Sequence, residues 1–137
     1  IAHEIGYRIT RQGGVALIVD YGNRRSLGDT LQSFRSHHRV PPLMSPGLAD
    51  LTAHVDFEAL AKASPSAHTR PTDQGVFLER LGITPRANQL VKSLQGSALT
   101  SHIAAHRRLT HPSEMGTLFK AMGLFPASAP PPPGLDC

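Results

Sequence analysis

The sequence predicts an α/β protein, and three features near its N-terminus support that fold class. Residues 1–12 carry an isoleucine at every fourth position, a spacing that favours an amphipathic helix. Gly13 and Gly14 follow and favour a helix end with a tight turn. The apolar run 15–19, rich in β-branched residues, then indicates a strand buried on both faces, as in the middle of a parallel sheet.

The polar segment after this strand is the first candidate site. Asp20, Tyr21 and Gly22 come directly after the apolar run. Ligands of open α/β sheets bind outside the carboxyl ends of the strands. We therefore expect these three residues to lie where a ligand would bind.

The middle of the chain predicts a long connection followed by short helices. Residues 23–50 hold several prolines and glycines and indicate a mostly irregular connection. Asp56 is a good N-cap for a helix over 57–63. Thr72 can cap a second short helix over 73–81.

The C-terminal part predicts further helices, one apolar segment and an extended tail. Thr84 before Pro85 predicts the start of a helix that reaches Gly96. Residues 97–109 predict another helix, and 118–125 predict either a strand or a buried turn. The tail, 129–137, contains four consecutive prolines and is expected to be disordered and solvated, with the domain proper over 1–128.

Composition excludes several classes of protein. The 137 residues carry a net charge of +4, with 39% hydrophobic and 18% charged residues, which is not the composition of a disordered chain. Cys137 is the single cysteine, so no disulfide framework forms within the chain. No apolar run approaches the ~18 residues that a membrane span needs. The basic residues are scattered and not interleaved with aromatics, so we expect no nucleic-acid partner.

Two clusters of ionisable residues could carry chemistry. His102 and His106 share one helical face, which permits a zinc site, although an exposed helix face is the simpler interpretation and we assign no metal. Asp50, His54 and Asp56 concentrate carboxylates and an imidazole within seven positions, which suits acid–base or orienting roles. Capping explains Asp56 well but explains neither Asp50 nor His54.

Several blocks of the sequence resemble one known family. The matching blocks run through the chain in family order and cover nearly all of it: 13–22, 28–32, Pro46-Gly47, 50–57, 74–78, 81–83, 114–116 and 118–120. They are similar to the MidA-like family of S-adenosylmethionine-dependent methyltransferases. Pro41 and Asn23 depart from the residues that family members often carry at those places.

The resemblance implies a fold, a cofactor and a substrate class. It implies that residues 1–128 are the C-terminal portion of a Rossmann-like class I methyltransferase fold with a helical insertion. Asp20, Tyr21 and Gly22 would then contribute to the binding of S-adenosyl-L-methionine, and the family's glycine-rich cofactor loop would lie upstream of Ile1. The mitochondrial members are protein arginine methyltransferases that help assemble respiratory complex I, which implies a protein substrate.

The family chemistry would be an in-line attack on the methyl group of the cofactor. Carboxylates would orient a guanidinium nucleophile by paired hydrogen bonds. Asp20, Asp50 and Asp56 are the candidates for that role, and His54 is the candidate proton acceptor. A chain without the first strands of its sheet would also expose a strand edge and half a core, and we expect it to be inactive alone.

An alternative function is a non-enzymatic interaction module derived from the same family. A histidine-based metal binder is a third, weaker interpretation. Homodimer formation is left open by the sequence. The compartment is the cytoplasm if the source is bacterial and the mitochondrial matrix if it is eukaryotic.

Overall fold

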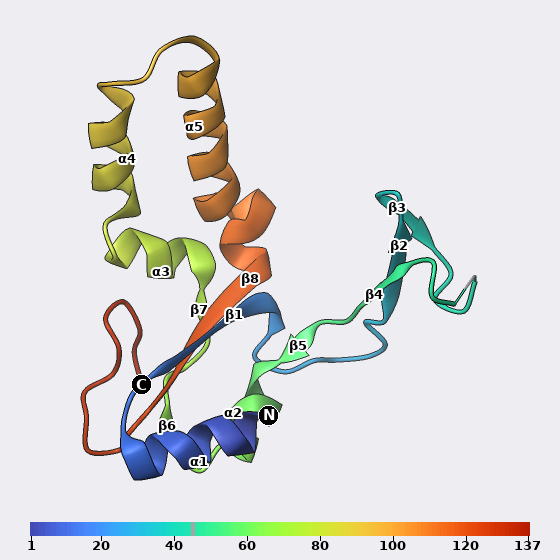
Figure 1. The fold of residues 1–137 in the computed structure, drawn as a ribbon, viewed down its shortest axis with the longest axis vertical. Coiled ribbons are helices and arrows are strands. Elements are labelled where there is room, and N and C mark those ends of the chain that lie inside the picture. The colour runs from blue at the N-terminus through green and yellow to red at the C-terminus, as the bar shows by residue number, and fades with distance from the viewer. Residues whose placement is uncertain (45) are drawn as a thin grey trace.

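The computed structural model describes residues 1–44 and 46–137. Figure 1 shows a small mixed sheet with helices on it, a second sheet to one side and a helical hairpin projecting away. The strands are β1 (Ala16–Asn23), β2 (Gln32–Arg35), β3 (His38–Val40), β4 (Asp50–Thr52), β5 (Val55–Asp56), β6 (Ala67–His68), β7 (Thr72–Asp73) and β8 (Phe119–Phe125). The helices are α1 (Ala2–Gln12), α2 (Phe57–Ala63), α3 (Gln74–Arg80), α4 (Ile83–Val91) and α5 (Gly96–Thr110), with a short irregular turn η1 (Pro112–Gly116).

The main sheet has the order β5-β1-β8-β6, and β7 also pairs with β8. Strand β8 runs antiparallel to β1, in a register that pairs Ala16 with Leu124 and Tyr21 with Phe119. It is also antiparallel to β6 and β7, so these two strands run parallel to β1. Strand β5 pairs in parallel with the end of β1. The apolar segment predicted over 118–125 as a strand or a buried turn is therefore a strand, β8. Strand β1 has this one antiparallel neighbour, whereas the sequence predicted the middle of a parallel sheet.

Helices α1 and α2 cover one face of this sheet. Ile9 of α1 and Phe57 of α2 pack with Met122 and Leu124 of β8 in a buried cluster. The predicted helices over 1–12 and 57–63 are both confirmed. The end of α1 at Gly13 and the start of α2 at Asp56 are both local signals, so these two boundaries are readable from the sequence.

The opposite face of β8 carries a second cluster, and the C-terminal tail is part of it. Phe77 of α3 packs there with Ala121 and Leu135. Asp136 forms a 2.6 Å ion pair with Arg80, and its carbonyl accepts a 2.8 Å hydrogen bond from the backbone N–H of Arg70. The expectation of a disordered, solvated tail is therefore wrong for Leu135 and Asp136. The prolines stiffen a segment that folds back onto α3.

Truncating Leu135 should destabilise the fold. Leu135 is 5% exposed, so Leu135→Ala is expected to lower the free energy of unfolding by about 2–3 kcal/mol. Leu43, which is 88% exposed, provides the matched control, and Leu43→Ala should change stability by less than about 0.5 kcal/mol. Urea denaturation measures both. Equal midpoints for the two variants would contradict the packed tail.

One face and one edge of β1 are uncovered in the described part of the chain. Leu17 is 51% exposed and Val19 is 42% exposed, whereas Ala16 and Ile18 pack on the first core. The prediction that this strand is buried on both faces is wrong for the chain as given. Positions 16–21 of β1 have β8 as their partner on one side, and no strand among the described residues pairs with their other side. This edge of β1 is therefore open within the described residues.

The predicted irregular connection contains a separate small sheet. Strands β2, β3 and β4 form a three-stranded antiparallel sheet with the order β3-β2-β4. Ser36 and His37, which join β2 to β3, both have positive φ, as the tightest hairpin turns require. The prediction of irregular structure over 23–50 is wrong for these strands, and Ser45 lies outside the described residues. Neither turn residue is a glycine, so the usual sequence signal for such a hairpin is absent.

Helices α3, α4 and α5 lie between β7 and β8 in the chain. The helix predicted over 97–109 is confirmed, but two predicted helix starts are wrong. Asp73 precedes α3, while Thr72 lies in β7, and α4 begins at Ile83 after Gly82 in the left-handed conformation. Helix α4 also ends at Val91, short of the predicted Gly96. Within the described ranges, none of these or the other helices is long and apolar enough to cross a membrane.

Candidate functional site

The candidate site lies where β5 joins the carboxyl end of β1. Gly22 pairs with Val55 and Asn23 pairs with Asp56, so residues far apart in sequence become neighbours. A Cβ atom on Gly22 would lie 2.2 Å from the carbonyl oxygen of Val55. A glycine is therefore required for the close approach of these two strands.

Tyr21 is the centre of an aromatic cluster at this junction. The Tyr21 ring meets the His54 ring edge-on, with centroids 5.7 Å apart and an interplanar angle of 83°. It meets Phe119 of β8 in the same way, at 5.6 Å and 70°. The backbone N–H of His54 donates a 3.1 Å hydrogen bond to the Thr30 hydroxyl, which fixes the entry to β5. The structure therefore brings together the predicted residues Tyr21 and His54.

Phe119 is a member of this cluster that residue chemistry did not single out. It lies within one of the family-like blocks, yet nothing near it in sequence assigns it a role. It meets Tyr21 because β8 pairs with β1 in antiparallel register. Such a register joins residues almost a hundred positions apart, and no local pattern in the sequence reports it.

Asp20 lies beside the aromatic cluster but on the other face of the strand. Successive side chains of a strand point to opposite faces, so Asp20 and Tyr21 diverge. One Asp20 carboxylate oxygen accepts a 2.8 Å hydrogen bond from the backbone N–H of Tyr21. Its cross-strand partner is Lys120, whose ammonium forms a 3.0 Å ion pair with Asp73. Asp20 thus lies at the end of β1 as predicted, but its side chain and the Tyr21 ring lie on different faces of the strand.

Asp56 has a structural role that occupies both of its carboxylate oxygens. Oδ1 accepts a 2.8 Å hydrogen bond from the backbone N–H of Ala59, and Oδ2 accepts a 3.1 Å bond from that of Ser26. The first bond is the predicted helix cap of α2, and the second ties the loop after β1 to the same carboxylate. These hydrogen bonds, that of Ala59 foremost, hold the pKa of Asp56 below its ordinary value of 3.8. A catalytic role for Asp56 stays a prediction.

This lowered pKa makes a prediction for the pH dependence of stability. A carboxylate whose pKa is lower in the folded state than in the unfolded state stabilises the fold at pH values above its unfolded-state pKa. That stabilisation is lost as the pH falls through the folded-state pKa. Asp56→Asn should therefore lower the melting temperature at pH 7 more than at pH 3. Thermal melts at both pH values measure the difference. Asp29→Asn, which removes an exposed loop carboxylate, is the control, and an identical pH profile for the two variants would contradict the assignment.

Asp50 lies on the other sheet. It is exposed in β4, where it pairs with Phe34 of β2. Together with Arg35 and Gly47 it lines a polar, open depression on that sheet. The structure therefore does not place Asp50 in the aromatic cluster, and its predicted catalytic role stays a prediction.

The histidines considered for a metal site contact a neighbouring helix. The Nε2 atom of His106 lies 2.9 Å from the Thr84 hydroxyl, and that of His102 lies 3.2 Å from the Ala87 carbonyl. Both side chains are half-buried against α4, which differs from the exposed helix face expected. Over residues 1–44 and 46–137, no group of three or more His, Cys, Asp or Glu residues is placed to hold a metal ion.

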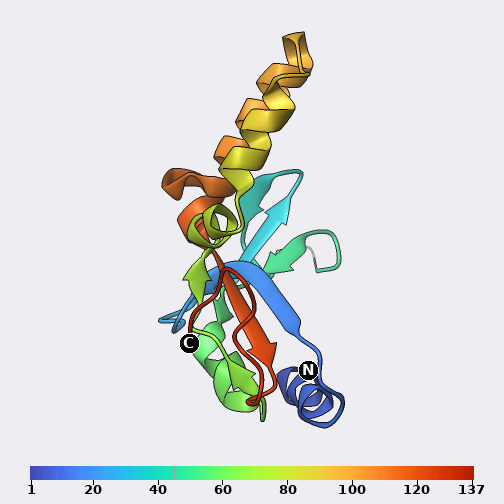
Figure 2. The same ribbon diagram turned by 90° about the vertical axis from the view of Figure 1, so that its left-hand side faces the viewer.

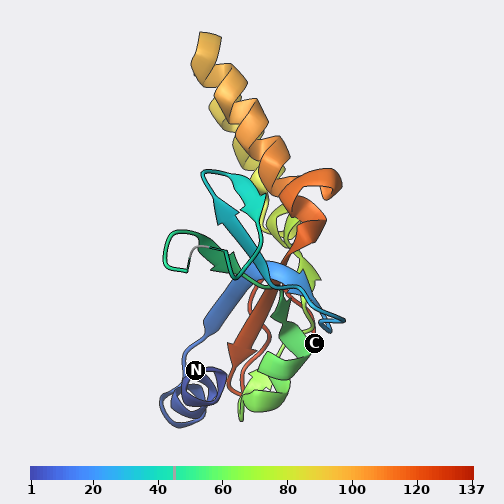
Figure 3. The same ribbon diagram turned by 90° about the vertical axis from the view of Figure 1, so that its right-hand side faces the viewer.

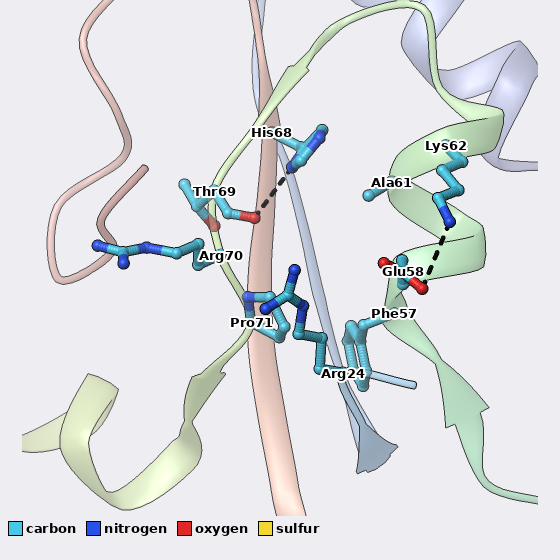
Figure 4. A pocket seen from close by; sticks show the side chains of 9 residues that line it. All are labelled: Arg24, Phe57, Glu58, Ala61, Lys62, His68, Thr69, Arg70 and Pro71. Atoms are coloured by element: carbon cyan, nitrogen blue, oxygen red, sulfur yellow. Dashed lines mark hydrogen bonds and ion pairs between the residues drawn. The ribbon is translucent and has the colours of Figure 1, made fainter. Parts of the chain in front are cut away.

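A separate cavity opens next to the start of α2. Figure 4 shows its nine lining side chains, with Arg24 and Pro71 beside Phe57 and with the Arg70 side chain pointing away from them. Its volume is about 200 Å³. Lys62 pairs with Glu58 at 3.4 Å. None of the predicted site residues lines this cavity, so it is distinct from the aromatic cluster.

The end of β1 lies where the sheets of α/β proteins bind ligands. Tyr21 presents its ring on one face of the strand, together with His54 and Phe119, and Asp20 presents its carboxylate on the other face. The two side chains therefore do not line one surface.

Comparison with known proteins identifies the family. A family described as "Putative S-adenosyl-L-methionine-dependent methyltransferase" matches residues 1–73, more than half of the chain. The chain belongs to this family. The match includes α1, β1, the small sheet, β5 and α2, and therefore both Tyr21 and His54 of the aromatic cluster.

Curated relatives of this chain are named protein arginine methyltransferases. The chain is 39% identical over 123 residues to the mitochondrial protein arginine methyltransferase NDUFAF7 homolog of Drosophila melanogaster, covering 87% of this chain and 28% of that protein. It is 37% identical over 129 residues to the mitochondrial protein arginine methyltransferase NDUFAF7 of Mus musculus, covering 92% and 30%. The chain thus spans less than a third of the length of these relatives.

Two solved structures share the fold of this chain. The crystal structure of an uncharacterized protein from Burkholderia thailandensis superimposes with a TM-score of 0.70 at 27% identity, covering 92% of this chain and 34% of that one. A second Burkholderia thailandensis structure, bound to S-adenosyl-homocysteine, has a TM-score of 0.67 at 28% identity, covering 90% and 33%. The α/β architecture is therefore shared with a structure that holds the demethylated form of the family's cofactor.

Proposed function

We propose that this chain forms the C-terminal part of a Rossmann-like, S-adenosyl-L-methionine-dependent methyltransferase that modifies arginine in a protein substrate. The observation that carries the proposal is the pairing of Tyr21 with His54 at the carboxyl end of β1, in a chain of this family. The names of the arginine methyltransferase relatives support the substrate class. Their names also support a mitochondrial location, and assembly of respiratory complex I, if the source is eukaryotic.

The residues at the end of β1 fit this role. Asp20, Tyr21 and Gly22 would hold the cofactor, which supplies an electrophilic methyl group when bound. Asp20 lies on the face of β1 opposite Tyr21, so its carboxylate would contact the cofactor from that side, and its role in orienting a guanidinium stays a prediction. A ring nitrogen of His54 takes the proton that the guanidinium nitrogen loses on methylation. Tyr21 holds that imidazole in place by the edge-to-face contact.

The small sheet is the substrate side in this proposal. It lies beside the end of β1 and is connected to it through the loops on either side of β2 and β4 (Figure 3). Asp50 on β4 is exposed and can pair with a cationic group of a bound protein. Its role would be to orient the substrate at a distance from the aromatic cluster.

Calorimetry of S-adenosyl-L-methionine binding tests the proposal. We expect a form extended upstream of Ile1 to bind the cofactor and the 137-residue chain alone to bind it much more weakly. A radiolabelled methyl donor with an arginine-containing protein substrate then tests transfer. Failure of both forms to bind would overturn the proposal and favour the second candidate, a non-enzymatic interaction module. The uncovered face of β1, with Leu17 and Val19 exposed, is the observation that favours that second candidate.

A further inference from the structure

Helices α4 and α5 form an arm that projects from the rest of the molecule. All three ribbon views show this hairpin extending beyond the sheets (Figures 1, 2 and 3). Its base is fixed by a short hydrogen-bond chain, in which the Thr84 hydroxyl donates to Glu79 at 2.7 Å and lies 2.9 Å from His106 Nε2. The Thr84 hydroxyl has one proton, so His106 donates its Nε2–H to Thr84. These contacts link α5 to the start of α4 and to α3.

The arm carries an apolar groove that the described part of the chain leaves uncovered. The groove has a volume of about 190 Å³ and runs between α4 and α5. Its apolar lining comes from both helices: Ile83, Ala87, Leu90, Ala105 and Leu109. None of the fifteen residues of α5 is buried. A helix pair that stands in water with an open apolar seam is typical of a binding surface.

The charged residues within the arm are all basic, and the nearby carboxylates, Glu79 and Glu114, come from outside it. Between Ile83 and Thr110 the sequence contains Arg86, Lys92, Arg107 and Arg108 but no aspartate or glutamate. Arg86 itself lines the groove. Arg107 is paired with Glu114, which lies outside the arm, at 2.9 Å. The arm therefore carries a net positive charge, with Arg86 beside the apolar seam.

We propose that this groove receives an amphipathic helix of an acidic protein partner. A helix in a groove places its apolar face against the seam, and acidic residues on its flanks then meet Arg86 and the positive charge of the arm. A second copy of the arm would bring like charges together, which disfavours self-association through this surface. The proposal rests on the arm alone and does not depend on the proposed methyltransferase activity.

Two matched peptides test the proposal on the 137-residue chain. Both are 18-residue designs with leucines spaced three and four apart; one carries glutamate at the polar positions and the other lysine. Fluorescence anisotropy at low salt should show the glutamate peptide binding at least about tenfold more tightly than the lysine peptide. Raising the salt concentration should weaken that binding, because rim charges are screened.

Charge reversal on the arm identifies the surface. Arg86→Glu should weaken binding of the glutamate peptide about tenfold, and Ala105→Glu should do the same by placing a carboxylate in the groove. Both positions are exposed, so the helix content of these variants should be unchanged by circular dichroism. The matched control is Arg39→Glu on β3, an equal charge change outside the arm, which should alter affinity less than about twofold.

Four outcomes would overturn the proposal. Equal affinities for the two peptides would show that charge does not select the partner. Equal losses for Arg86→Glu and Arg39→Glu would show a diffuse charge effect. Binding of anionic phosphatidylglycerol vesicles, with no binding of the glutamate peptide, would make the arm a membrane surface. A dimer that dissociates on Arg86→Glu would make a second copy the occupant.

Discussion

Replacing Gly22 with valine is expected to separate β5 from β1 and to destabilise the chain by about 3 kcal/mol or more. A Cβ atom at this position would lie 2.2 Å from the Val55 carbonyl oxygen and 2.8 Å from the Val55 nitrogen. Both are backbone atoms of the paired strand, so no side-chain rotation relieves the overlap. Urea denaturation measures the loss in the free energy of unfolding.

The neighbouring position supplies the control for this change. Asn23 is exposed in the same strand, and Asn23→Val introduces the same β-branched side chain without a clash. We expect Asn23→Val to change stability by less than about 0.5 kcal/mol. Equal stability for Gly22→Val and Asn23→Val would show that β5 can move away from β1 at little cost. That result would remove the structural reason for placing His54 beside Tyr21.

Replacing His54 with alanine in a form extended upstream of Ile1 is expected to lower turnover by about 100-fold or more, the usual loss for a general base. His54 is the proton acceptor of the proposed mechanism, and its ring is held by Tyr21. Asp50→Ala is expected to lower turnover as well, through the orientation of the substrate. Initial rates of methyl transfer at saturating cofactor measure both effects.

Three further variants separate these roles from a general loss of structure. His3→Ala removes an exposed histidine of α1 and should leave turnover unchanged. Tyr21→Phe keeps the ring contact with His54 and should retain more turnover than Tyr21→Ala. Unchanged turnover in His54→Ala, with cofactor binding intact, would contradict the role of His54 as proton acceptor. Unchanged turnover in Asp50→Ala would remove Asp50 from the site.

Local signals explain the elements that the sequence predicted well. The helix over 57–63 begins at Asp56, whose side chain accepts the capping hydrogen bond from Ala59. The helix over 97–109 is continuous and long enough to be recognised without its partners. The resemblance to a methyltransferase family is also a property of the sequence, because its blocks occur in order along the chain.

Pairing between distant segments explains what the sequence did not predict. The small sheet depends on β2 pairing with β4 across a long loop, and the tail depends on Leu135 reaching Phe77. In the candidate site, Tyr21 and His54 were each predicted, but their contact and the presence of Phe119 were not. Each of these results requires a strand register or a chain reversal that joins distant residues.

The sequence by itself determined the α/β class, the capped and amphipathic helices, the methyltransferase family and the segment at the end of β1. These properties arise from neighbouring residues or from their order along the chain. The tertiary structure alone decided which of the candidate residues meet. It joins Tyr21 to His54 and Phe119. It also engages both carboxylate oxygens of Asp56 in backbone hydrogen bonds and places Asp50 on the second sheet. The physical reason is that strand pairing brings residues together by register, which a short-range pattern in the sequence does not encode.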